Sequence, residues 1–238
     1  MIKADRRTVG GIIDPLGDEK DKAERRLLRI IKERLGGQYE QVVKLLGDPP
    51  DLANLTQEFW ATESGKMLAT VRPELEALAL QAGEQVIATG VGIAWDLVAE
   101  GAATWATEHA GRLITGITET TRTQVGKVVE RYFREAGATT GDLARGLETW
   151  FSPARAEAIA VTEVTTAAAE GSRAAAQVAE QAGYTMDPVW HTNRDELVCA
   201  ICGPNDGKRK SEGWTVEGIP AHPRCRCWQT YKVGRAGE

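Results

Sequence analysis

The sequence predicts a mainly α-helical protein that ends in a small C-terminal α+β module. Up to Gly183, apolar residues recur at spacings of three and four, which is the period of helices with one buried face. After Gly183 a short stretch is rich in residues that favour extended backbone, and from Cys199 onward turn residues dominate. All four cysteines lie in this last stretch. The two parts are therefore expected to be stabilised differently.

The composition is that of a globular protein and argues against some functions. With 238 residues, 42% of them hydrophobic and 26% charged, the chain can form one large domain or two modest ones. Its formal net charge of -5 argues against bulk electrostatic capture of DNA. Residues 1–18 are polar and lack the apolar core of an export signal. Residues 85–107 contain Asp96 and Glu100, so they predict a buried or partner-facing helix and no membrane span.

The N-terminal half predicts several amphipathic helices. Residues 19–46 alternate leucines, isoleucines and valines with charged residues, and the pair Gly36 and Gly37 is expected to bend or break that helix. A second helix is expected from Leu52. Pro73 suits the first turn of a third, because proline lacks the N–H group that a first turn leaves unpaired.

The second half predicts three further helices, at residues 118–136, 140–150 and 153–181. Ser152 is expected to cap the last of them, with proline in its first turn and Gly183 after its end. Small side chains follow one another along this helix in steps of four and three, at Glu157, Val161, Val164, Ala168, Gly171, Ala175, Val178 and Ala182. We expect this seam to pack against a helix of the same chain; a seam between subunits is the alternative. Strands are expected at residues 184–192 and 226–233.

The cysteines have the spacing of metal ligands. Cys199 and Cys202 are separated by two residues, which lets both sulfurs reach one ion. About twenty residues later, His222 and Cys225 repeat that gap, and Cys227 follows. If the backbone there is extended, Cys225 and Cys227 point to the same face. Clustered cysteines in a chain with no recognisable export signal indicate metal before disulfides.

One structural zinc ion is the expected occupant, held by four of these five donors. Cys199 and Cys202 are expected in every set, Cys225 and Cys227 are favoured for the other two places, and His222 is the rival for one of them. Residues 199–227 contain few large apolar side chains, so burial alone would not order them. A structural zinc ion contributes on the order of 10 kcal/mol in small modules. Unliganded reduced cysteines and a disulfide are the alternatives, and thiolates that fill the coordination sphere argue against a catalytic ion and against an enzyme.

The tail is basic although the whole chain is acidic. Five cations lie in or beside the metal-binding segment: Lys208, Arg209, Lys210, Arg224 and Arg226. They are candidates for contact with packaged DNA or with an acidic partner. The alternative is that they offset thiolate charge or are simply solvated.

Together these features resemble a known family. The resemblance rests on Arg155, residues 159–163, 190–192 and 195–199, Cys202, Asp206, Gly207 and residues 220–227. This pattern resembles the phage Mu F-like head morphogenesis domain, which occurs in minor capsid proteins of tailed bacteriophages. It covers roughly residues 120–231, and its most specific part is the Cys199 and Cys202 arm together with residues 222–227, His-Pro-Arg-Cys-Arg-Cys. Val161 departs from the pattern, because the family often has arginine there.

The resemblance implies a minor head protein that helps assembly or DNA delivery from the capsid interior. Expected partners are the portal protein and the major capsid protein, with no membrane, several copies per virion, and residence in the host cytoplasm during assembly. The corresponding domains are a helical N-terminal region at 1–115 and the family domain at 116–238, with the metal module at about 184–233. The residues carried over are Thr162, Glu163, Cys199, Cys202, His222, Cys225 and Cys227.

Some expectations stay open from the sequence. We expect Glu163 to make a polar contact with the metal module, and a solvated carboxylate is the alternative. A zinc-containing DNA-binding adaptor at the portal is the second functional hypothesis. A metal-dependent nuclease is the third, and it needs a histidine or carboxylate cluster beyond the structural ligands. The chain has only three histidines, and His109 lies far upstream.

Overall fold

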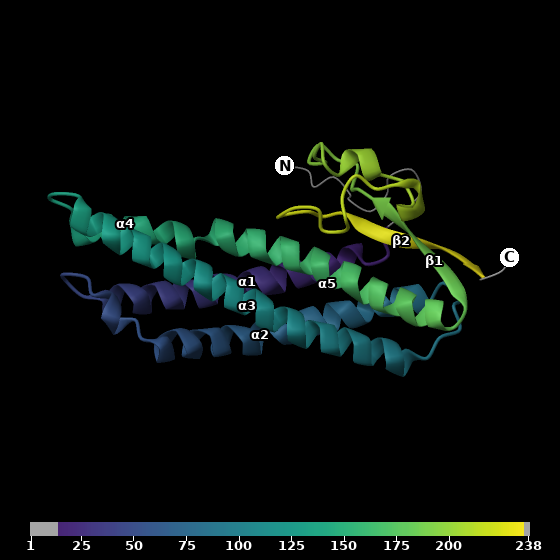
Figure 1. Ribbon diagram of the computed structural model, residues 1–238, viewed down its shortest axis with the longest axis horizontal. Coiled ribbons are helices and arrows are strands. Elements are labelled where there is room, and N and C mark those ends of the chain that lie inside the picture. Colours follow the sequence, from purple (N-terminus) through teal and green to yellow (C-terminus); the bar gives the residue numbers. More distant parts are fainter. Residues whose placement is uncertain (1–13, 236–238) are drawn as a thin grey trace.

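The computed structural model describes residues 14–235 and shows an elongated helical bundle with a small module at one end (Figure 1). The α-helices are α1 (Gly17–Leu46), α2 (Gln57–Ile87), α3 (Trp95–Arg134), α4 (Thr140–Glu148) and α5 (Pro153–Gln181). The strands are β1 (Tyr184–His191) and β2 (Trp228–Arg235). Short 3₁₀ turns are η1 (Leu52–Asn54), η2 (Thr149–Phe151), η3 (Gly203–Asn205) and η4 (Lys210–Glu212). The predicted fold class, mainly helical with a small C-terminal α+β module, is confirmed.

The expected break at Gly36 and Gly37 is wrong, because α1 continues through both residues. Leu35 and Val42, which flank the pair, are fully buried. Each glycine costs a helix about 1 kcal/mol relative to alanine, whereas burying one such apolar side chain contributes about 1.5–3 kcal/mol. Burial on both sides therefore outweighs the glycines.

The expected helix start at Pro73 is also wrong, since Pro73 lies in the interior of α2. The true start is set by Thr56, whose hydroxyl accepts a hydrogen bond from the Phe59 N–H at 3.2 Å. Val71 and Leu75, on either side of the proline, are buried against the other helices. The helix consequently begins near residue 57 and not at Leu52, and packing holds it together across the proline.

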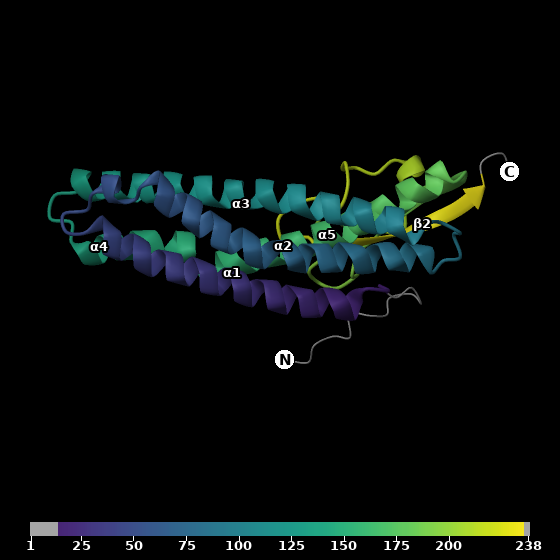
Figure 2. The same cartoon turned by 90° about the horizontal axis from the view of Figure 1, so that it is seen from below.

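The hairpin of α2 and α3 packs these two helices side by side, and α2 also lies against α1 (Figure 2). Gly90 adopts a φ of +92° between α2 and α3, a conformation that glycine permits. Residues 85–107 are therefore divided between two helices and their connection. Among residues 14–235, no helix has the length and apolar content needed to cross a membrane. The expected lack of an export signal concerns mainly residues outside the described part. The expected domain boundary at 115 and 116 falls inside α3.

The last helix, α5, forms at the predicted residues and packs inside the chain. The Ser152 hydroxyl accepts the Arg155 N–H at 3.3 Å, and Gly183 has a φ of +89° just after the helix ends. In the middle of the small-residue seam, a Cβ added to Gly171 would lie 2.0 Å from the carbonyl oxygen of Ala79 in α2. Because α2 approaches so closely at this point, only glycine fits at position 171 of the seam.

The strands form an antiparallel pair that covers the end of α5. Residue pairs run from Tyr184 opposite Arg235 to His191 opposite Trp228. Met186 packs with Val86, Val98 and several α5 alanines in a separate small core. The sheet thereby fixes both ends of the segment that carries the cysteines.

Candidate metal centre

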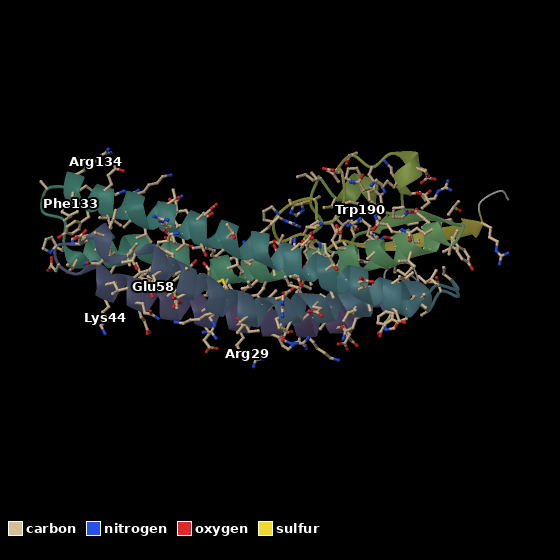
Figure 3. The ribbon with its side chains drawn as sticks, turned by 60° about the horizontal axis from the view of Figure 1, so that its bottom comes forward. Arg29, Lys44, Glu58, Phe133, Arg134 and Trp190 are labelled. Carbon is tan, nitrogen blue, oxygen red and sulfur yellow. The ribbon has the colours of Figure 1, made fainter. Side chains whose placement is uncertain are left out.

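The segment between the strands is anchored on Trp190, which is fully buried in the module (Figure 3). Its backbone N–H donates to the Lys208 carbonyl at 2.9 Å, and its backbone carbonyl accepts the Gly207 N–H at 2.8 Å. Its ring meets Trp214 edge to face, with centroids 5.1 Å apart. These contacts fold the insert back onto β1.

Asn205 holds the insert from inside and was not singled out from the sequence. It is fully buried. Its side-chain N–H donates to the Ile201 carbonyl at 3.2 Å, and its side-chain oxygen accepts the Thr215 N–H at 2.8 Å. An asparagine inside a turn-rich segment is common, so the sequence gives no signal for this role.

The first arm of the candidate metal centre, from Cys199 to Cys202, is a tight turn. The Gly203 N–H donates to the Cys199 carbonyl at 3.0 Å, and the Cys202 N–H points at the Cys199 sulfur at 3.4 Å. The turn places both sulfurs on its inner side, with Cys202 buried.

The second arm, His222 to Cys225, is a turn closed one residue earlier than the first. The Cys225 N–H donates to the His222 carbonyl at 3.1 Å, and Arg224 adopts a φ of +63° at its corner. His222 Nε2 lies 3.1 Å from the Cys199 sulfur and 3.3 Å from the Cys202 sulfur. The two arms therefore face one another.

All five predicted donors are brought together. Cys199, Cys202 and His222 form one group, Cys202, Cys225 and Cys227 form another, and the donor atoms within each group lie within 4.8 Å of one another. The Cys202 and Cys225 sulfurs are 3.9 Å apart, and all four cysteines are free thiols. The cluster could hold a metal ion, and neither group contains a carboxylate.

The local electrostatics favour a thiolate at the centre. The hydrogen bond from Cys227 lowers the pKa of Cys225 to about 5. Burial raises the pKa of Cys202 to about 12, and the shared hydrogen bond with Cys225 raises the pKa of Cys227. Burial also acts to raise the pKa of Cys199, but the N–H groups that point at its sulfur lower it overall. Metal ligation requires deprotonated sulfur, and Cys225 is already in that form at neutral pH.

The second arm also binds the helical bundle. The Thr165 hydroxyl donates to the Cys225 carbonyl at 2.6 Å, and the Arg224 N–H donates to the Thr162 hydroxyl at 2.9 Å. Arg226 forms an ion pair with Glu24 of α1 at 2.7 Å. Thr162 was expected from the family resemblance, whereas Thr165 and Glu24 were not.

The expectation that Glu163 contacts the metal module is wrong. Its carboxylate lies 2.6 Å from His109 Nε2 on α3, and the His109 ring stacks on Trp105 with centroids 4.7 Å apart. Successive residues on a helix point about 100° apart, so Glu163 faces α3 while Thr162 faces the module. The carboxylate is buried, which also rules out the solvated alternative.

The basic residues of the tail differ in their partners. Arg209 pairs with Glu212 at 2.7 Å, Arg226 pairs with Glu24, and Arg224 lies 3.8 Å from Glu157. Lys210 lies over the Trp214 ring, 5.8 Å from its centroid. Three of the five cations considered as candidates for contact with DNA or an acidic partner are thus already opposite carboxylates of this chain.

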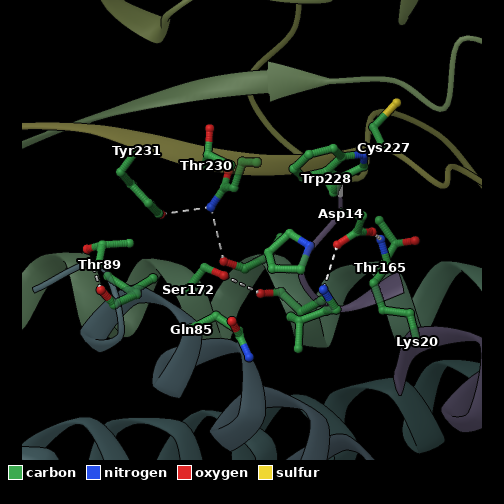
Figure 4. Close-up of a pocket in the computed structure, with 16 residues that line it drawn as sticks. Asp14, Lys20, Gln85, Thr89, Thr165, Ser172, Cys227, Trp228, Thr230 and Tyr231 are labelled. Atoms are coloured by element: carbon green, nitrogen blue, oxygen red, sulfur yellow. Dashed lines mark hydrogen bonds and ion pairs between the residues drawn. The ribbon is translucent and has the colours of Figure 1, made fainter. Parts of the chain in front are cut away.

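A small pocket lies on the other side of β2, between that strand, α5 and the start of α1 (Figure 4). Its volume is about 100 Å³. An ion pair between Lys20 and Asp14 at 2.8 Å closes one side. The Ser172 hydroxyl donates to the helix backbone, and the Gln229 amide donates to the Tyr231 hydroxyl at 2.8 Å. These polar groups therefore already have partners inside the protein.

Comparisons with models of known protein families, with curated proteins and with solved structures found no match for this chain.

Proposed function

We propose that this protein is a minor capsid protein that acts in head morphogenesis of a tailed phage, and that one structural zinc ion holds its C-terminal module. The observation that carries the metal assignment is the meeting of five sulfur and imidazole donors from residues 199–202 and 222–227. The resemblance at residues 120–231 carries the link to phage heads.

Zinc is the ion that fits this donor set best. Thiolates with one imidazole favour zinc or iron–sulfur chemistry, whereas magnesium and calcium prefer oxygen. The core of the module consists largely of the cysteines themselves, with Trp190, Ile219 and Ala169. Because so little apolar surface surrounds them, the ion would supply much of the free energy that orders the module.

A structural role fits assembly better than catalysis. The donors that meet here are thiols and one ring, and a site that they fill leaves no open position for water. The second arm joins the module to α1 and α5, so a bound ion would make bundle and module one rigid body. Such a body suits a protein that docks on the portal or the major capsid protein in several copies, inside the virion and earlier in the host cytoplasm.

The proposal is tested in two measurements. Metal analysis of the purified chain is expected to give close to one zinc per chain. Co-expression with the portal and major capsid proteins encoded nearby is expected to yield a complex, and mass spectrometry should find the chain in isolated heads. A chain without zinc contradicts the metal centre, and absence from both complex and heads contradicts the assembly role.

Contact with packaged DNA is the less favoured role. Arg209, Arg224 and Arg226 are opposite carboxylates, which leaves Lys208 and Lys210 as the remaining tail cations. Two lysines give only a weak interaction, because affinity of this kind grows with the number of phosphates neutralised. A gel-shift series across salt concentrations, with the Lys208→Ala, Lys210→Ala double variant as control, tests it: tight binding that persists near physiological salt would favour the adaptor instead.

A further inference from the structure

We propose that the two tight turns supply all four ligands, Cys199, Cys202, His222 and Cys225, and that Cys227 is an outer thiol that supports them without binding the ion. This inference rests on the proposed zinc centre and deepens it.

The two arms have the same donor spacing, although their turns are closed differently. In each, a donor residue is followed after two residues by a second donor, and an N–H bonds back to the first donor's carbonyl, from the fourth residue on in the first arm and from the third in the second. The bonds are those of Gly203 to Cys199 and of Cys225 to His222, at 3.0 and 3.1 Å. Such a turn presents the side chains at its two ends to one point. The backbone thus pairs Cys225 with His222 and leaves Cys227 outside the turn.

His222 is oriented as a ligand. Its Nδ1 lies 2.8 Å from the Pro223 carbonyl oxygen, which can only accept, so Nδ1 carries the proton. In the neutral ring that metal binding requires, Nε2 then has a lone pair that faces the sulfurs of Cys199 and Cys202 at 3.1 and 3.3 Å. In a tetrahedral zinc site the nitrogen and sulfur ligands are about 3.5 Å apart. A backbone carbonyl that fixes the ring in this way is the usual support of a metal-bound histidine.

Cys225 completes the set. Its sulfur lies 3.9 Å from that of Cys202, close to the separation of about 3.8 Å between two thiolates on one zinc ion. It belongs to the same turn as His222, so the two donors approach the first arm together.

Cys227 differs from Cys225 in its place in the chain. Both group with Cys202 and neither groups with Cys199 and His222, but only Cys225 lies in the turn that carries His222. Cys227 directly precedes β2, where pairing with β1 fixes the chain, and it lies in the wall between the cluster and the pocket of Figure 4. From there the S–H group can donate to a ligand thiolate.

The charge of the centre favours His222 over a fourth thiolate. A zinc ion with three thiolates and a neutral imidazole keeps one negative charge, whereas four thiolates leave two. The nearby guanidinium groups of Arg224 and Arg226 are engaged with Glu157 and Glu24, so they offer the centre little compensation. A buried site favours the set with the smaller uncompensated charge.

The test uses the full chain loaded with cobalt(II), whose absorption reports the number of thiolates bound. The matched variants are Cys225→Ser and Cys227→Ser, the same change two residues apart. We expect Cys227→Ser to keep one metal per chain and the wild-type spectrum. Cys225→Ser should lose about one third of the sulfur-to-cobalt charge-transfer intensity, which is one thiolate of three, or lose the metal. His222→Cys should shift the spectrum to that of a four-thiolate site.

The outcomes separate the two proposals. A Cys227→Ser protein that loses charge-transfer intensity or metal overturns the ligand assignment, and so does a His222→Ala protein with an unchanged spectrum. If the wild-type chain binds neither cobalt nor zinc, the metal centre itself is wrong. Because the decisive result is an intact spectrum in Cys227→Ser, unfolding of the Cys225→Ser module does not obscure it.

Discussion

Three neighbouring residues on α5 have three different partners. Thr162 accepts from the Arg224 N–H, Glu163 pairs with His109, and Thr165 donates to the Cys225 carbonyl. One helical turn thus joins α5 both to α3 and to the second metal-binding arm. At this scale, the position of the candidate metal centre depends on single hydrogen bonds to the bundle as well as on its own donors.

Replacement of the central thiol tests the structural role of the ion. Cys202→Ser is expected to lose zinc and to become protease-sensitive after about Gly183, while its far-ultraviolet helical signal is largely kept. The reason is that α1 to α5 have apolar cores of their own, whereas the module has few large apolar groups. Limited proteolysis followed by mass measurement checks this, with wild-type protein as the control. A cleavage pattern like that of the wild type would refute the structural role.

Zinc affinity is expected to rise with pH. Burial raises the pKa of the Cys202 thiol to about 12, so at neutral pH this thiol is protonated without metal and must release its proton on binding. The pKa of Cys225, lowered to about 5 by its bond from Cys227, means that it releases none. Apparent affinity should therefore increase at least about tenfold per pH unit between about pH 6 and 8. Competition with a chelator measures it, and a pH-independent affinity would contradict these proton assignments.

At the scale of elements, the close contact between α2 and α5 has an energetic consequence. Gly171→Ala places a methyl group against the Ala79 backbone, so it should destabilise the fold by about 1–3 kcal/mol, the usual cost of overpacking. The matched control is Gly116→Ala in α3, where an added Cβ meets nothing within 4 Å; it should stabilise by about 0.5–1 kcal/mol. Urea unfolding compares the two. Equal effects of both substitutions would mean that the helices do not approach so closely.

The elements differ in how well the sequence predicts them. The ends of α5 were predicted correctly because Ser152, Pro153 and Gly183 act locally, through a cap, a fixed φ and a positive φ. The helix break expected at Gly36 and the helix start expected at Pro73 were wrong, because burial of other residues in the same helices overrides the local preference of glycine and proline.

The candidate site was predictable for the same reason that α5 was. Spacing alone identified the five donors, because two-residue gaps act locally. Thr165 and Glu24 could not be found in this way, since their partners lie 60 and 202 residues away and only the packed fold brings them together. The sequence therefore predicts features that depend on neighbouring residues, and it misses contacts between residues that are far apart in the chain.

At the scale of the whole molecule, the ion pair between Arg226 and Glu24 connects the module to α1. Arg226→Glu should increase hydrogen exchange at the start of α1 and in the second arm, because it places two carboxylates together. The double variant Glu24→Arg, Arg226→Glu should restore protection, with zinc content as the control for an intact centre. A pair this well covered contributes on the order of 1 kcal/mol. Unchanged exchange in the single variant would show that the pair does not hold the module.

That same ion pair joins two residues that are synthesised at very different times. A ribosome adds about 5–20 residues per second, so Glu24 is made on the order of tens of seconds before a partner 202 residues later. During this interval α1, α2 and α3 can already associate. The face of α1 around Glu24 stays uncovered, because Arg226 has not yet been synthesised. Newly made chains on one message therefore expose that face to one another until the module folds onto it.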